Sequence, residues 1–311
     1  KYYVKEAYTD QHYILSDKKY PLEFSYQGQD AALVEIHANE GEAIGNGLFR
    51  GRIEGIKMDT GGKALKNAKI GLFTVDTEKF SEKTALLVST SGRDGAFCFE
   101  GVPFGNYIVR EIESPEGYVL NGESHYVSVA KEGEMVRLKI TNKRIEGSVR
   151  LQKVDADCPK KRLSGAVFEL YRDTDGNGEF NPKKDKRVSR IPEVSDGIYQ
   201  KDGLCHGGYF VKEKAAPKGF RLDKQAYFFE VEEDGKIVDV ENKAGVGFAN
   251  KPETSKFELT KKDVSDGRLL PDAKFRIKDK DGNVVATGMT DKTGIATFTL
   301  RSGKYTYQEY E

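Results

Sequence analysis

The stretch GNYIVREIESPEGY at residues 105–118 returns as GGYFVKEKAAPKGF at residues 207–220. Both copies hold a tyrosine, a glutamate four positions after it, and a Pro-x-Gly-aromatic ending. A long stretch that recurs with its spacing intact indicates a tandem array of one small domain. We call this stretch the Tyr/Glu box, and it aligns the rest of the chain.

Weaker copies of the Tyr/Glu box stand in the first and last parts of the chain. The first runs from Tyr2 through Glu6, but it has Asp10 and His12 at the positions of the proline and the glycine. The last contains only the first half of the box, which includes Glu309. Four glutamates therefore follow a tyrosine at the same interval.

Lysine and asparagine recur in the same register. Three asparagines each precede a lysine by eleven positions, and these pairs are Asn46–Lys57, Asn142–Lys153 and Asn250–Lys261. The lysines recur after 96 and then 108 residues, and so do the asparagines. Each interval is the length of one small domain, so the close pairs mark the junctions between domains.

The repeats divide the chain into four parts. Residues 50–145 and 146–252 are two complete domains, residues 1–49 are the last part of an upstream domain, and residues 253–311 are the first part of a downstream one. A chain of 311 residues also exceeds the roughly 100–200 residues of a single domain. Because the sequence opens abruptly inside a repeat, we expect it to be an internal window of a longer protein.

Alternating apolar and polar residues predict an all-β fold. First strands include residues 149–153 and 257–261, and period-two alternation places their lysines on the inward, apolar face. Further strands are expected near residues 68–73, 166–171, 273–277 and 295–298, and around the pair Phe97 and Phe99. Turns rich in Gly and Asp separate these segments. We therefore expect about seven strands per complete domain, folded as an Ig-like β-sandwich.

The composition limits the partners and activities of the chain. Fifty Lys and Arg balance 50 Asp and Glu, and the signs are interspersed, so neither nucleic acid nor an acidic membrane surface is indicated. The sequence contains no apolar run of transmembrane length. Its four histidines are scattered over different repeats, without a nucleophile motif or a phosphate loop, so no conventional enzyme is expected.

Three cysteines, at Cys98, Cys158 and Cys205, are too few and too odd in number for a disulfide framework. Cys158 and Cys205 fall within one repeat. The sequence leaves open whether these two pair or remain free, because pairing depends on their geometry.

Three motifs in register carry a resemblance to a known family. They are a first-strand Lys-x-Asp at residues 57–59, 153–155 and 261–263, the Tyr/Glu box, and a closing asparagine at Asn142 and Asn250. Over essentially its whole length the chain resembles the Cna B-type, or SpaA-like, repeats of Gram-positive surface adhesins and pilus shafts. The resemblance implies a prealbumin-like β-sandwich and an extracellular location on the bacterial cell wall.

The resemblance also implies an isopeptide bond between lysine and asparagine side chains, promoted by the glutamate of the box. The implied sets are Lys57 with Asn142 and Glu111, and Lys153 with Asn250 and Glu213. Burial disfavours the charged forms of both groups, so the amine becomes a nucleophile and the glutamate shuttles protons to the departing ammonia. Each domain would react once, on itself, and would require no cofactor.

Two further sets are incomplete. Glu6 and Asn46 lack a lysine, and Lys261 and Glu309 lack an asparagine.

A plainer interpretation of the same residues stays open. An inward lysine near a strand end can reach solvent, and a glutamate after a tyrosine can be a surface ion-pair partner. Asn39 and Asn242 are alternative acceptors, although both stand in turn-like contexts.

One loop has a partial calcium motif. Asp173, Asp175, Asn177 and Glu179 offer oxygen atoms at alternate positions, with glycine between them. The second half of the motif fails, because Lys184 stands where a glutamate would be. We predict at most weak calcium binding, and the alternative is a polar hairpin tip that needs no ion.

Two functional classes follow. The first is a structural stalk, in which neighbouring repeats of the same protein, locked by isopeptide bonds, project a tip adhesin that contacts host extracellular matrix or glycan through another region. The second is an adhesin module in which these repeats themselves bind host matrix protein or glycan. No basic stripe or aromatic platform marks such a binding surface in the sequence.

Overall fold

The computed structural model describes residues 2–26, 28–29 and 33–310. The described residues form β-strands and one short 3-10 helix, η1 at Ala38–Gly41. The predicted all-β fold is therefore confirmed. Two compact units divide the chain, Lys1–Arg144 and Ile145–Glu311. Within the described ranges no helix is long and apolar enough to cross a membrane.

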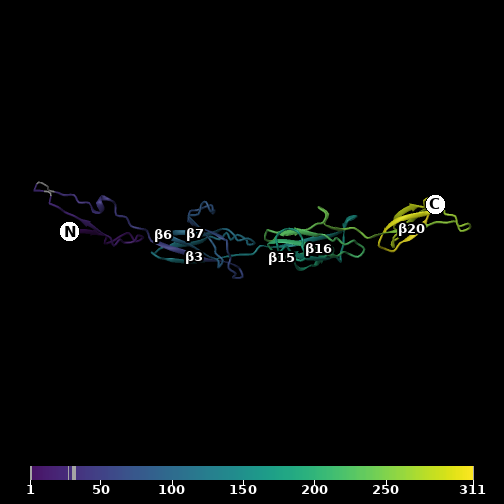
Figure 1. Ribbon diagram of the computed structural model, residues 1–311, viewed down its shortest axis with the longest axis horizontal. Coiled ribbons are helices and arrows are strands. Elements are labelled where there is room, and N and C mark those ends of the chain that lie inside the picture. Colours follow the sequence, from purple (N-terminus) through teal and green to yellow (C-terminus); the bar gives the residue numbers. More distant parts are fainter. Residues whose placement is uncertain (1, 27, 30–32, 311) are drawn as a thin grey trace. The chain divides into compact units, whose positions relative to one another are not determined.

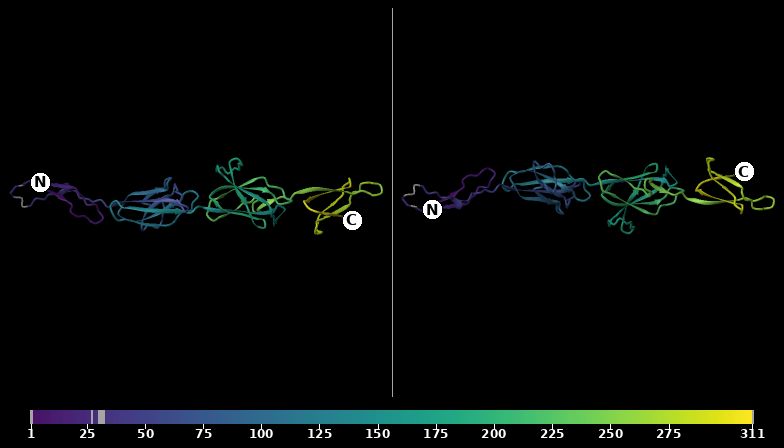
Figure 2. Two further views of the ribbon diagram at one scale, coloured as in Figure 1. Left: turned by 90° about the horizontal axis from the view of Figure 1, so that it is seen from below. Right: turned by 90° about the horizontal axis from the view of Figure 1, so that it is seen from above.

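Residues 50–145, all of which are described, form seven strands in two layers (Figures 1 and 2). One sheet has the order β6-β3-β9 and the other has the order β5-β4-β7-β8. The strands are β3 at Arg50–Asp59, β4 at Lys69–Thr74, β5 at Leu87–Thr90, β6 at Ala96–Pro103, β7 at Gly105–Glu113, β8 at His125–Val129 and β9 at Met135–Asn142. The predicted sandwich is confirmed, with the first strand lying parallel to the last.

Alternation along β3 decides what enters the core of this repeat. Every second residue of the strand is buried, so Ile53, Lys57 and Asp59 all lie on its inward face. Ile53 shares one buried apolar cluster with Leu72 and Val109 of the opposing sheet. The lysine and the aspartate are therefore held in a layer that is otherwise apolar.

Gly55 allows β3 to pass over the aromatic core. A Cβ atom at this position would lie 2.3 Å from Cζ of Phe97 and 2.9 Å from the carbonyl oxygen of Leu138. Both contacts are shorter than side chains tolerate, so glycine is required here for close packing rather than for its backbone freedom.

The second complete repeat is built around β10 at Glu146–Asp155 (Figure 1). Its sheet has the order β11-β10-β15-β14, and β18 and β19 also pair with β10, in parallel. The opposing sheet has the order β13-β12-β16-β17. The remaining bounds are β11 at Cys158–Arg162, β12 at Val167–Arg172, β13 at Lys186–Ile191, β14 at Glu193–Ser195, β15 at Ile198–Cys205, β16 at Gly207–Ala215, β17 at Ala226–Val231, β18 at Ile237–Asp239 and β19 at Phe248–Asn250.

The closing strand differs between the two repeats. In the first repeat β9 is continuous, whereas in the second the equivalent strand is split into β18 and β19. Residues 240–247 separate the two pieces and account for part of the longer second interval. The last three residues before the junction keep their parallel pairing with β10, so Asn250 keeps its place.

Shorter sheets stand on either side of the complete repeats along the chain. In residues 1–49, β1 at Tyr2–Lys5 pairs with β2 at Lys19–Leu22. In residues 253–311, β20 at Thr254–Thr260 pairs with β23 at Ile295–Arg301, and the second sheet has the order β22-β21-β24. The bounds of its strands are β21 at Lys274–Lys278, β22 at Val284–Met289 and β24 at Thr306–Glu309. Phe275, Ile277 and Phe298 form the small core there.

In three of the four boxes the tyrosine closes the turn before its own strand. Its hydroxyl donates to the backbone carbonyl four residues earlier, and these bonds are Tyr107 to Pro103 at 2.8 Å, Tyr209 to Cys205 at 2.8 Å and Tyr305 to Arg301 at 3.0 Å. A buried aromatic ring with a satisfied hydroxyl fixes the start of the strand that carries the glutamate. The Tyr-to-Glu spacing is thus a structural constraint as well as a marker.

The three cysteines are free, and Cys158 and Cys205 are exposed. The pairing that the sequence left open is therefore not formed.

Candidate functional site

Parallel pairing of the first and last strands brings the predicted lysine and asparagine together. In the first repeat Asp59 of β3 pairs with Asn142 of β9, which places Lys57, two residues earlier, beside the closing asparagine. Glu111 comes from β7 in the opposing sheet. Three strands that are distant in sequence thus deliver one side chain each to the same point of the core.

The three side chains of the first repeat are in direct contact. Lys57 Nζ lies 3.0 Å from Glu111 Oε1 and donates to Asn142 Oδ1. Asn142 Nδ2 donates to Glu111 Oε1 at 3.0 Å and to Oε2 at 2.9 Å. The exposed fractions of the lysine, glutamate and asparagine are 0%, 2% and 1%. The amine therefore meets the amide in a site closed to water, with the carboxylate on the nitrogen that would leave.

The second repeat assembles the same three residue types with a different lysine contact. Lys153 Nζ lies 3.1 Å from Glu213 Oε1, and Asn250 Nδ2 donates to Glu213 Oε2 at 2.8 Å. Lys153 Nζ donates to the carbonyl of Phe248 at 3.2 Å rather than to the asparagine. Asn250 Nδ2 also donates to the carbonyl of Arg221. Among the described residues, Asn250 Oδ1 has no hydrogen-bond partner.

Both lysines lie in an environment that favours the neutral amine. Burial lowers the pKa of Lys57, and the charge of Glu111 opposes that shift. Burial likewise lowers the pKa of Lys153, against the charge of Glu213. The snorkelling alternative does not apply to these two side chains, because each is fully buried.

Sequence reasoning missed a backbone donor that holds each glutamate. The N–H of the residue ten positions after the glutamate donates to Oε2, and these bonds are Ser16 to Glu6 at 2.9 Å, Asn121 to Glu111 at 2.7 Å and Asp223 to Glu213 at 2.9 Å. The only sequence signal is the constant interval, because a main-chain donor does not require a particular side chain. The interaction fixes the carboxylate that faces the lysine and the asparagine.

The aspartate of the Lys-x-Asp motif also has a role that the sequence did not reveal. Asp59 is 2% exposed, and its Oδ1 accepts from the N–H groups of Gly61 and Lys63, both at 2.9 Å. Its Oδ2 accepts from Nη2 of Arg144 at 2.7 Å. The aspartate therefore shapes the turn that follows the reactive lysine.

Asp155 is the matching aspartate of the second repeat. It is fully buried, and its Oδ2 accepts from Nη1 of Arg301 at 2.6 Å.

The two incomplete sets each hold part of the same arrangement. Asn46 Nδ2 donates to Glu6 Oε1 at 2.5 Å in the first part of the chain. Lys261 Nζ lies 2.7 Å from Glu309 Oε2 in the last part, where the two side chains are 33% and 44% exposed. Lys261 lies just beyond the end of β20.

Both alternative acceptors use their amides elsewhere. Asn39 Nδ2 donates to the carbonyl of Glu42 at 3.2 Å, within the loop around η1. Asn242 Nδ2 donates to Asp223 Oδ2 and to the carbonyl of Ala249, both at 2.8 Å. Its Oδ1 accepts from the N–H of Ala249 at 2.6 Å. These bonds orient Asn242 for a structural role.

The acidic hairpin of the second repeat holds a cluster that differs from the predicted one. Carboxylate oxygens of Asp173, Asp175 and Asp185 lie within 4.8 Å of one another. Of the other predicted ligands, Glu179 is not in this cluster, and Asn177 Oδ1 accepts from the N–H of Glu179 at 2.7 Å.

The cluster carboxylates already have partners within the hairpin. Asp173 accepts from the N–H groups of Gly176 at 2.8 Å and Gly178 at 2.9 Å, and Lys184 Nζ lies 3.0 Å from Asp175. Such contacts are those of a hairpin tip stabilised by its own backbone.

Comparison with known proteins identifies the family. The family model for the SpaA prealbumin-like fold domain matches residues 51–144, 147–244 and 255–311. The chain therefore belongs to the SpaA prealbumin-like fold family, and the resemblance found in the sequence is confirmed. No curated protein matches the sequence significantly.

The chain is also similar to solved structures. The Bacillus anthracis TIE protein matches with a TM-score of 0.65 and 29% identity, over 86% of this chain and 46% of that one. BcpA, the major pilin subunit of Bacillus cereus, has a TM-score of 0.42 and 15% identity, over 84% of this chain and 87% of that one. The full-length major pilin SpaD from Corynebacterium diphtheriae has a TM-score of 0.27 and 14% identity, over 84% and 87%. The chain thus spans less than half the length of the TIE protein.

Proposed function

We propose that this chain is a stalk segment of a Gram-positive surface protein or pilin, whose two complete repeats, 50–145 and 146–252, each form one lysine–asparagine isopeptide bond. The observation that carries the proposal is the contact of Lys57, Glu111 and Asn142, all buried, at the point where the first and last strands pair. Leaving an unreacted lysine and glutamate in an apolar core would cost folding free energy. The same three residue types are buried together in both repeats.

The reaction exchanges one amide for another. Neutral Lys57 Nζ attacks Cγ of Asn142, the bond from Cγ to Nδ2 breaks, and Nδ2 leaves as ammonia. Glu111 contacts both nitrogens, so it takes a proton from the attacking amine and gives one to the leaving nitrogen. The fold supplies the near-attack geometry, which is worth roughly 7–11 kcal/mol in well-oriented intramolecular reactions. Each repeat reacts once and is not an enzyme for other molecules.

The position of the bond suits a load-bearing segment. Tension enters the first repeat at β3 and leaves it after β9, and the bond joins these two strands near Lys57 and Asn142. The force then passes through the covalent link, and residues 58–141 are bypassed. A tandem stalk gains from this arrangement because no repeat can be drawn out end to end.

The proposed setting is the bacterial cell surface, with neighbouring repeats of the same protein as the partners of this segment. No cofactor is required for the bond. A host matrix protein or glycan would be contacted by another region of the longer protein.

The mass of the intact purified chain tests the proposal. Each bond releases one ammonia, about 17 Da, and denaturation does not restore it. We expect a deficit of two ammonias, with tandem mass spectrometry linking Lys57 to Asn142 and Lys153 to Asn250. The variant Lys57→Ala/Lys153→Ala is the control, and it must show the full mass.

A full mass for the native chain would contradict the proposal and leave an unlinked β-sandwich array. Binding to a glycan array or to matrix proteins by residues 50–252 would then support the adhesin-module alternative.

A further inference from the structure

The two complete sites differ at the residue that donates its N–H to the glutamate. Asn121 holds this position in the first repeat, and Asp223 holds it in the second. A neutral amide in one site is therefore a carboxylate in the other. No other change of formal charge occurs among the residues that contact the two glutamates through hydrogen bonds.

Asp223 is held firmly by its neighbours. Its Oδ2 accepts from the hydroxyl of Tyr227 at 2.6 Å and from Nδ2 of Asn242 at 2.8 Å, and its Oδ1 accepts from the N–H of Gln225 at 2.9 Å. These bonds lower the pKa of Asp223, although its partial burial acts in the opposite direction. The carboxylate is thus a fixed negative charge beside the site.

Asp223 also acts on the strand that carries Asn250. It orients Asn242, which both donates to and accepts from the backbone of Ala249, the residue immediately before Asn250. In the first repeat Asn121 does the corresponding work directly, by donating Nδ2 to the carbonyl of Thr141 at 2.9 Å. The second repeat therefore uses two side chains, Asp223 and Asn242, to hold the backbone next to the closing asparagine, whereas the first repeat uses Asn121 alone.

The negative charge of Asp223 also reaches Lys153. It opposes the effect of burial on the pKa of Lys153, in the same sense as Glu213 does. Phe168 and Phe248 are the rings around this amine, with Nζ 5.8 and 4.8 Å from their centroids, and both are uncharged. Glu213 and Asp223 are thus the ionised groups that act on the lysine.

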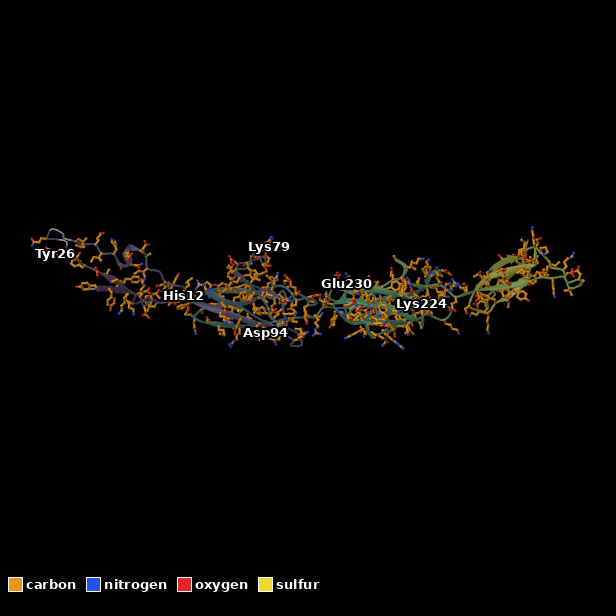
Figure 3. The ribbon with its side chains drawn as sticks, viewed as in Figure 1. His12, Tyr26, Lys79, Asp94, Lys224 and Glu230 are labelled. Atoms are coloured by element: carbon orange, nitrogen blue, oxygen red, sulfur yellow. The ribbon has the colours of Figure 1, made fainter. Side chains whose placement is uncertain are left out.

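Beyond the lysine, Asp223 and Asn250 line a cavity of about 880 Å³. The charged groups Lys224, Lys243, Lys251, Arg221 and Asp157 and the phenol of Tyr227 line it as well. Lys224 is exposed on the second repeat (Figure 3).

The lysine contacts of the two sites also differ. In the first repeat Lys57 Nζ donates to the amide oxygen of Asn142. In the second, Lys153 Nζ donates to Phe248, and Asn250 Oδ1 is buried without a hydrogen-bond partner among the described residues. In the second site the amine therefore makes no hydrogen bond to the acceptor amide oxygen.

We propose that Asp223 regulates the second crosslink: through Asn242 it sets the strand that carries Asn250, and its carboxylate adds a negative charge next to the Lys153–Glu213 pair, so that the bond of the second repeat forms later than that of the first. This inference rests on the proposed function. An added negative charge favours the binding of a second proton by the Lys153–Glu213 pair, and the doubly protonated pair has no neutral amine to attack with. Asp223 acts through these residues, so it is a positioning residue.

Kinetics of refolding test the inference. The full chain is unfolded in urea after recovery from inclusion bodies, diluted to start folding, and sampled over pH 5–9 by tandem mass spectrometry of each crosslink. We expect the bond between Lys57 and Asn142 to form several-fold sooner than the bond between Lys153 and Asn250. Asp223→Asn should speed the second bond roughly three- to tenfold below neutral pH and move the acid limb of its pH profile downward, because one pKa unit is a tenfold change in the neutral fraction.

The reciprocal variant Asn121→Asp is the matched control. It should slow the first bond and move its acid limb upward while the second bond is unchanged. If Asp223→Asn slows the second bond and leaves its pH profile in place, the residue acts only through structure and the inference is overturned. If Asp223→Asn does not fold, the response of the first bond to Asn121→Asp decides the question.

Failure of the proposed function looks different. In that case neither crosslink appears in the native chain at any pH. If both crosslinks form, and neither Asp223→Asn nor Asn121→Asp changes the rate of its crosslink, this inference is overturned while the proposed function stands.

Discussion

Glu111 contacts Nζ of Lys57 and Nδ2 of Asn142, the attacking and leaving nitrogens of the proposed reaction, so its substitution separates chemistry from folding. Glu111→Gln keeps the shape of the side chain and removes the proton acceptor. We expect the variant to fold and to retain one ammonia in its mass. Its first repeat should lose roughly 4 kcal/mol of unfolding free energy, by the chain-entropy argument that applies to a crosslink closing a loop of this length.

The measurement is intact mass together with the thermal melting of residues 50–145. Glu54→Gln, a change at a half-buried residue of β3 that pairs with Arg137, is a control that should leave the mass deficit intact. Continued loss of both ammonias from Glu111→Gln would remove the glutamate from the mechanism.

Free amines at Lys57 and Lys153 would make the unfolding free energy depend on pH. The proposed isopeptide bonds would remove that dependence. In Asn142→Ala/Asn250→Ala both amines remain free, and burial lowers the pKa of Lys57 and Lys153 in the folded state. Between those lowered values and the roughly 10.4 of an unfolded lysine, the unfolded chain binds more protons. The unfolding free energy of the variant should therefore rise with pH across that window and be lost as the pH falls.

Urea unfolding of this variant and of the native chain from pH 6 to 10 checks the expectation. Under the proposed function the native chain has amides at these two positions, so its slope should be smaller. Equal slopes would mean that the native lysines are still free.

At the scale of the strand, Gly55 sets how closely β3 approaches β6 and β9. Gly55→Ala places a methyl group against the ring of Phe97 and the carbonyl of Leu138. Overpacking of this kind costs about 1–3 kcal/mol, which denaturant melting of the first repeat would measure. Gly45→Ala is a suitable control, because its added Cβ meets nothing within 4 Å. An unchanged midpoint for Gly55→Ala would show that the sheet shifts to accept the methyl group.

The prediction of at most weak calcium binding can be tested at the hairpin of residues 173–185. Its carboxylates already accept backbone N–H groups, and a lysine contacts Asp175. We expect melting of the second repeat to move little when calcium or a chelator is added. A calcium-dependent rise in the melting temperature that Asp173→Asn/Asp185→Asn removes would establish a metal site there.

For the whole molecule, the proposed bonds would determine how far each repeat can extend under force. In the native chain pulled from both ends, residues 58–141 should not lengthen, because the load crosses from Lys57 to Asn142. In Lys57→Ala the same residues should add roughly 280–300 Å at about 3.3–3.6 Å per residue. Single-molecule stretching distinguishes the two, and a native first repeat that unravels fully would exclude a load-bearing bond.

The sequence by itself determined the repeats and the all-β fold, because core positions in strands alternate with period two. It also named the residues proposed to react, because a covalent reaction demands particular side chains. Lys57, Glu111 and Asn142 could be assigned from spacing and resemblance, and the structure brings them together. Tertiary structure alone supplied the backbone donors at Asn121 and Asp223, since any residue type carries an N–H. The tertiary structure also showed that the amide of Asn242 is bonded to the backbone of Ala249. It showed that Asp155 accepts from Arg301, a partner far away in the sequence that comes close only once the strands have packed.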